Sequence, residues 1–95
     1  MRKYETIFIL HPTLDENAVN EGIEKVKGVI ENGGGVVENV DFWGKRKLAY
    51  EIEKVKDGYY TLINFSSDTD LPKELDRVFR ITDSVIRHII VRLEK

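Results

Sequence analysis

The stretch "WGKRKLAYEI", residues 43–52, has the strongest potential for binding chemistry in this sequence. It holds three consecutive cations, Lys45, Arg46 and Lys47, and continues with apolar residues at the two-residue spacing of a β-strand. Such cations can contact phosphates, and Tyr50 beside them can pack on a sugar or an unpaired base. The competing interpretation is that charge on an outer strand prevents edge-to-edge aggregation.

Other cations lie in separate parts of the chain, although the formal net charge is −2. Positive charge is in excess only in residues 1–12, 45–57 and 84–95. A negative total argues against a protein that neutralises many phosphates alone, so folding must gather the cations if they are to act together. The candidate RNA-binding residues are Arg2, Lys3, Tyr4, Lys45, Arg46, Tyr50, Lys54, Lys56, Arg87 and Arg92.

Residues with catalytic or metal-binding spacing are not found in the sequence. His11 and His88 have no cysteine or second histidine at ligand spacing, and the chain has no cysteine at all. Gly33, Gly34 and Gly35 follow a predicted helix, where glycine ends helices, rather than precede one, where it would cradle phosphate. We therefore expect no enzyme activity, no cofactor and no small-molecule substrate.

Length and composition predict one domain spanning residues 1–95. The chain has 41% hydrophobic residues, and no segment approaches the roughly 20 apolar residues that span a bilayer. The apolar run that ends at Leu10 is too short for a signal peptide, and the absence of cysteine is consistent with a reducing compartment. We expect a cytoplasmic protein without membrane association.

Hydrophobic periodicity predicts six elements in the order β-α-β-β-α-β. The strands are 3–10, 36 to about 54, 59–65 and 84–93, and helices begin near Thr13 and near 70–72. Thr13 and Glu16 have the spacing of a capping box, and Gly44 predicts a bulge or bend. The Asp57-Gly58 pair predicts the turn of a hairpin whose tip carries Lys54 and Lys56.

This order predicts an α+β fold, a ferredoxin-like two-layer sandwich with an antiparallel four-stranded sheet in the order 4-1-3-2. Right-handed crossovers place both helices on one face, so the other sheet face is left open. We expect Thr6, Phe8 and Leu10 in the core and, on the open face, Arg87 together with the candidate protein-partner residues Ile7, Ile9, Ile89 and Val91. An exposed apolar patch of this kind favours a partner-binding surface. This account requires that Arg2, Arg46 and Arg87 not lie at opposite poles.

Four motifs in chain order resemble ribosomal protein six of the bacterial small subunit. They are the start "MRKYE" with His11-Pro12, "GKRKLAYEI" at 44–52, "GYY" at 58–60 and "RITDSVIRH" at 80–88. The resemblance implies a structural constituent of the small ribosomal subunit. It also implies binding to the central domain of 16S rRNA as a heterodimer with small-subunit ribosomal protein eighteen.

Two departures from the family pattern limit what the resemblance implies. Lys47 and Glu53 stand where members often have other polar or basic residues, so we expect no phosphate contact at position 53. The sequence ends at Lys95, whereas many members have a longer tail, so we expect no partner contact through such a tail.

Two alternatives share the same order of elements. An RNA-recognition motif would continue Gly58-Tyr59 with a small residue and a second aromatic, and the sequence departs from this after two positions. A small-molecule-binding regulatory module of ferredoxin-like fold would need a glycine in the first strand-to-helix loop, and residues 11–15 contain none. The regulatory module remains the alternative function from a different class.

Overall fold

The computed structural model describes residues 1–52 and 54–93. Its elements are β1 (Arg2–Leu10), α1 (Glu16–Asn32), β2 (Val36–Ile52), β3 (Val55–Ser67), α2 (Leu71–Ile81) and β4 (Val85–Arg92). The predicted β-α-β-β-α-β order is confirmed. The expectations for position 53 and for a C-terminal tail after Lys95 concern parts of the chain outside the described residues.

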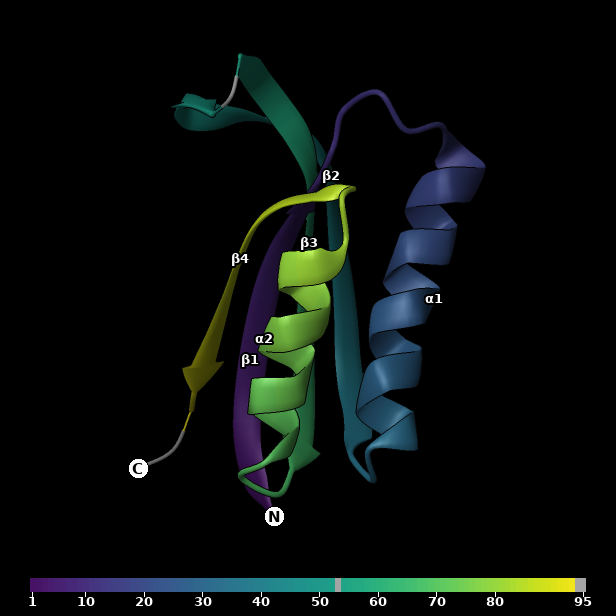
Figure 1. Ribbon diagram of the computed structural model, residues 1–95, viewed down its shortest axis with the longest axis vertical. Coiled ribbons are helices and arrows are strands. Elements are labelled where there is room, and N and C mark those ends of the chain that lie inside the picture. Colours follow the sequence, from purple (N-terminus) through teal and green to yellow (C-terminus); the bar gives the residue numbers. More distant parts are fainter. Residues whose placement is uncertain (53, 94–95) are drawn as a thin grey trace.

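The strands form one antiparallel sheet in the order β2-β3-β1-β4, which is the predicted order. Figure 1 shows α1 and α2 together on one face of this sheet. On that face Thr6, Phe8 and Leu10 are buried, which confirms the predicted orientation of β1. The opposite face therefore receives Ile7 and Ile9, together with Arg87 and Ile89 of the neighbouring strand.

The core lies between the helices and the covered face of the sheet. Val19, Ile23, Val26 and Ile30 supply it from α1, because apolar residues three or four apart share one side of a helix. From α2, Leu75 and Phe79 are buried, and the Phe79 ring lies 5.3 Å from that of Phe8, centre to centre. Burial of this apolar surface fixes which sheet face remains free.

Helix α1 begins later than the proposed capping box predicts. Asp15 is the N-cap, and its Oδ1 accepts from the backbone N–H of Ala18 at 2.8 Å. Thr13 Oγ1 lies instead 2.8 Å from His11 Nδ1 in the preceding turn. The capping-box prediction was wrong because an aspartate closer to the helix satisfies the same orphan donors.

The predicted Asp57-Gly58 turn is also wrong, because both residues lie inside β3, paired with Lys47 and Arg46. The last pair of the hairpin joins Ile52 to Val55, so the two strands continue beyond the predicted turn. Gly58 lies instead at a close contact between β3 and β1. A Cβ placed there would lie 2.5 Å from Ile9 Cγ2 and 2.9 Å from the Leu10 carbonyl oxygen. Glycine allows β3 to pass this close to β1.

The far part of the β2–β3 hairpin bends over the open sheet face. The predicted irregularity at Gly44 is confirmed, since the register shifts between Phe42 and Gly44 and Gly44 has φ +86°. Figure 1 shows the hairpin extending beyond the helices and turning towards the β4 side. Leu48 is buried as a result, so this end of the face is covered rather than bare.

Candidate functional site

Aromatic and cationic side chains gather on the open face where the hairpin leaves the sheet. The Trp43 and Tyr60 rings stack with centres 6.1 Å apart and planes at 14°. Trp43 Nε1 donates to Asp41 Oδ2 at 2.9 Å, which fixes the indole, and the Arg46 guanidinium carbon lies 5.6 Å from its ring centre. The bulge at Gly44 allows a cation and two aromatics to meet here.

Arg87 of β4 continues this group across the sheet. Tyr60 and Arg87 both pair with Ile9, so all three lie in one row on the open face. Arg87 Nη1 donates to the Tyr50 hydroxyl, and the guanidinium carbon lies 5.4 Å from the centre of the Tyr50 ring. We call Trp43, Arg46, Tyr50, Tyr60 and Arg87 the hairpin-end surface.

A second aromatic pair lies on the other side of the same hairpin. Phe42 and Tyr59 stack with ring centres 6.3 Å apart, and Lys45 Nζ lies 5.7 Å from the Tyr59 ring centre. Phe42 is half-exposed although it belongs to a strand next to α1. Arg46 and Lys45 therefore present charge on opposite sides of the hairpin, because consecutive strand residues alternate in direction.

An apolar strip adjoins the hairpin-end surface. Ile89 and Val91 of β4 are exposed at 46% and 43%, and Ile7 beside them is half-buried. Together with the hairpin, Ile7 and Ile89 line a hollow of about 290 Å³. Ile9 lines the same hollow but is only 6% exposed, because Gly58 and the bent hairpin cover it. The expectation that Ile9 is available to a partner was therefore wrong.

The other end of the open face is a polar network. Lys3 Nζ donates to Glu38 Oε2 at 3.0 Å, and Ser66 Oγ donates to the same oxygen at 2.5 Å. The Ser66 hydrogen bond, and then that of Lys3, lower the pKa of Glu38 from its ordinary value. Glu38 thus compensates the charge of Lys3 within the chain.

Two of the predicted RNA-binding residues lie elsewhere than expected. Tyr4 is 6% exposed and its ring stacks on Phe65 in the core, so its assignment to base packing was wrong. Strand parity explains this, because Tyr4 has the same direction as Thr6. Arg2 pairs with Ser67 at the opposite end of β1 from Arg87, roughly 23 Å away along the strand. The requirement that Arg2, Arg46 and Arg87 lie together therefore fails for Arg2, and only Arg46 and Arg87 are grouped at the hairpin.

The remaining predicted cations divide between two places. Lys54, with φ +67°, lies where the hairpin turns, and Lys56 is exposed on β3 just after it. Arg92 pairs with Tyr4, so it faces the helix layer rather than the open face. The structure therefore groups Lys45, Arg46, Lys54, Lys56 and Arg87 around the hairpin, and separates them from Arg2 and Arg92.

Trp43 and Tyr60 were missed as candidate contact residues by sequence reasoning. Their stacking depends on the register of β2 against β3, which residue types do not reveal. A signal was present: Trp43 directly precedes Gly44, where a bulge can turn its indole towards the neighbouring strand.

Neither histidine has the surroundings of a metal ligand. His11 lies against Thr13 and His88 against Asp76. Within residues 1–52 and 54–93, no three His, Cys, Asp or Glu side chains are arranged to hold a metal ion. The two helices of the described chain are both too short or too polar to cross a membrane.

The fold and the hairpin-end surface place the chain among ferredoxin-like α+β proteins whose free sheet face carries aromatic and basic side chains. The sequence profile described as Ribosomal protein S6 matches residues 3–92. This chain belongs to the ribosomal protein S6 family.

Individual relatives agree with this assignment. The chain is 75% identical over 95 residues to Small ribosomal subunit protein bS6 of Clostridium kluyveri, covering 100% of both chains. It is 71% identical over 94 residues to the protein of the same name from Clostridium botulinum, covering 99% of this chain and 100% of that one. The crystal structure of 30S ribosomal protein S6 from Thermotoga maritima superposes with a TM-score of 0.92 at 38% identity, covering 96% of this chain and 86% of that one. All three relatives are named as ribosomal proteins of the small or 30S subunit.

Proposed function

We propose that this chain, acting as one domain of residues 1–95, is a structural constituent of the small ribosomal subunit, located in the cytoplasm with the ribosome. In this role it binds the central domain of 16S rRNA together with small-subunit ribosomal protein eighteen. The observation that carries the proposal is the junction of the hairpin-end surface with the apolar strip in a member of the ribosomal protein S6 family. Such a junction offers one surface to phosphates and bases and an adjacent one to a protein.

The RNA contact belongs to the hairpin. Cations there stand beside aromatic rings, so a phosphate and an unpaired base can be held by neighbouring side chains. Phosphate contacts of this kind position a protein on folded RNA and do not read sequence. Lys45, Arg46 and Arg87 are the cations that the structure joins to aromatic partners.

The protein contact belongs to the apolar strip. Ile89 and Val91 are exposed on an edge strand, and their burial by a partner is favourable by about 25 cal/mol per Å² of apolar surface. The net charge of −2 limits the affinity of this chain for RNA on its own. A basic companion protein on the strip would supply the missing positive charge.

Measuring the affinity for a fragment of the 16S rRNA central domain at several salt concentrations tests the proposal. We expect weak binding by the isolated chain, tight binding by the heterodimer, and a loss of affinity with increasing salt, because bound cations release counterions from RNA. Tight binding by the isolated chain that does not change with salt would contradict the proposal. A saturable thermal shift with an amino acid or nucleotide would instead favour the regulatory module.

The strip can be tested with a pair of substitutions. Ile89→Asp buries a charge under the partner, and we expect the heterodimer dissociation constant to rise at least about tenfold. Ile81→Asp is the matched control, because Ile81 is also an exposed isoleucine, at 64%, but lies at the end of α2. Titration calorimetry measures both. Equal effects of the two substitutions would exclude the strip as the partner surface.

A further inference from the structure

A groove between α2 and β4 lies on the other side of the edge strand from the apolar strip. It has a volume of about 540 Å³, and its polar side chains are those of Lys73, Asp76, Arg80, His88 and Arg92. Because side chains alternate along β4, Ile89 and Val91 turn to the open face while His88 and Arg92 turn towards α2. His88 and Ile89 line both hollows, so the two surfaces meet along β4.

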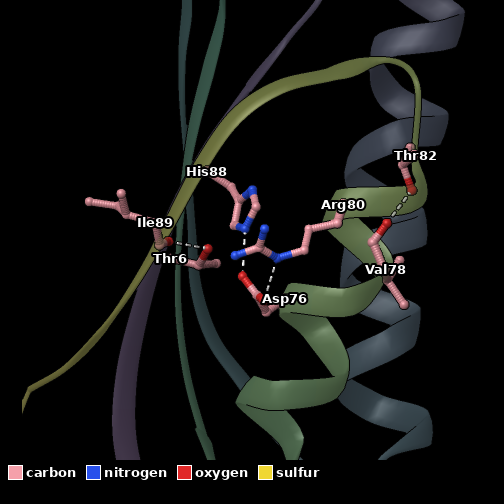
Figure 2. Close-up of polar contacts among 7 residues, drawn as sticks. All are labelled: Thr6, Asp76, Val78, Arg80, Thr82, His88 and Ile89. Atoms are coloured by element: carbon pink, nitrogen blue, oxygen red, sulfur yellow. Dashed lines mark hydrogen bonds and ion pairs between the residues drawn. The ribbon is translucent and has the colours of Figure 1, made fainter.

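Arg80 is oriented within this groove by a contact with Asp76. Its Nε donates to Asp76 Oδ2 at 2.7 Å, and His88 Nε2 lies 2.7 Å from Asp76 Oδ1 (Figure 2). Since an ionised carboxylate only accepts hydrogen bonds, Nε2 of His88 carries the proton. Asp76 thus uses one oxygen for each partner and leaves the two terminal nitrogens of Arg80 without a hydrogen bond to the described residues.

Contacts with the core also position His88 and the β4 backbone beside it. The His88 ring stacks on Phe79 with centres 4.7 Å apart, and Thr6 Oγ1 donates to the Ile89 carbonyl at 2.8 Å. Figure 2 shows Arg80 reaching from α2 towards β4 beside His88. A guanidinium that is positioned before binding loses little conformational freedom when it binds a ligand.

The groove has a positive charge balance. Lys73, Arg80 and Arg92 are exposed cations, whereas Asp76 is the one carboxylate that lines it within residues 1–52 and 54–93. The nearby Asp68 is used to cap α2, because its Oδ1 accepts from the backbone N–H groups of Asp70 and Leu71. Phosphate oxygens match a guanidinium with two free terminal nitrogens, which can donate in parallel.

We propose that this groove is a second RNA-binding site, in which Arg80, Lys73 and Arg92 bind phosphates of the RNA backbone. The inference rests on the proposed function, because it supplies a further contact to the same RNA. Its apolar lining residues Tyr4, Pro72 and Ile90 are buried or half-buried, and Ile89 at its edge is exposed. A phosphate backbone suits three exposed cations around this lining better than a protein does, because a protein interface would require several exposed apolar anchors.

The test compares Arg80→Ala with Arg77→Ala in the heterodimer bound to the 16S rRNA central-domain fragment. Arg77 is a matched control: it lies on the same helix, is 60% exposed against 70% for Arg80, and pairs with Glu74 at 2.7 Å. It does not line the groove. We expect Arg80→Ala to weaken RNA binding about tenfold and to reduce the slope of log affinity against log salt by about one. Arg77→Ala should change neither quantity.

A second variant guards against a loss of folding. Lys73→Glu leaves the Arg80–Asp76–His88 contacts intact and should weaken RNA binding, with an unchanged melting temperature. Equal affinities for Arg80→Ala and Arg77→Ala would overturn the inference while leaving the proposed function in place. Weaker heterodimer formation by Arg80→Ala without RNA would assign the groove to a protein and also overturn it. If the unmodified heterodimer does not bind the fragment, the proposed function itself fails.

Discussion

Tyr4 illustrates how position in a strand outweighs residue type. As a tyrosine that follows Arg2 and Lys3, it was expected to face RNA, but the same alternation that buries Thr6 and Phe8 buries Tyr4. The direction of the Tyr4 side chain could be predicted from the sequence once Thr6 was assigned to the core. The stacking of Trp43, the ring under Arg46, on Tyr60 could not be predicted, since it depends on the register of β2 against β3.

The hydrogen-bonded carboxylate of Asp76 leads to a prediction about how stability depends on pH. Hydrogen bonds from Arg80, and then from His88, lower the pKa of Asp76 from its ordinary value. A lowered folded-state pKa means that the stabilisation is complete above the unfolded pKa of about 4 and is lost as the pH falls through the folded value. We expect Asp76→Asn to be less stable than the unmodified protein at pH 7, with the difference shrinking below about pH 4.

Urea unfolding from pH 7 to pH 2 measures this difference. Glu38 and Glu74 also have lowered pKa values, so both proteins should still lose stability in acid. The diagnostic quantity is therefore the gap between the two unfolding free energies. A gap that stays constant over the whole range would show that the charge of Asp76 does not stabilise the fold.

At the scale of elements, the order and sheet topology were predictable because hydrophobic periodicity and right-handed crossovers leave few arrangements. The shape of the β2–β3 hairpin was not. Asp57-Gly58 is a favoured turn pair, but continued pairing of Lys47 with Asp57 and Ile52 with Val55 outweighs that local preference. The bend that covers Ile9 follows from this longer hairpin.

A substitution at Gly58 tests whether the stability of the fold depends on the close approach of β3 to β1. An added Cβ would meet Ile9 and the Leu10 carbonyl oxygen, a backbone atom that cannot move aside. We expect Gly58→Ala to lower the free energy of unfolding by about 1–3 kcal/mol, measured by urea unfolding. Gly28→Ala is the control, since a Cβ there has no neighbour within 4 Å and alanine favours the interior of α1 by about 0.5–1 kcal/mol. A stabilising Gly58→Ala would contradict the close approach.

At the scale of the whole molecule, a chain with net charge −2 gathers two groups of cations, one at the hairpin and one in the α2–β4 groove. The sequence showed three basic stretches but could not show this division. The direction of each cation depends on strand register, and Arg87 and Arg92 lie on opposite faces of one strand. A partner on the apolar strip and RNA at both basic surfaces would together enclose β4.

Hydrogen–deuterium exchange of the free chain and of the complex with 16S rRNA central domain and small-subunit ribosomal protein eighteen tests this arrangement most directly. The account predicts slower exchange in the complex along β4 and in the hairpin around Arg46 and Tyr50, with the exposed side of α1 unchanged. Slower exchange confined to α1, with β4 and the hairpin as in the free chain, would contradict it.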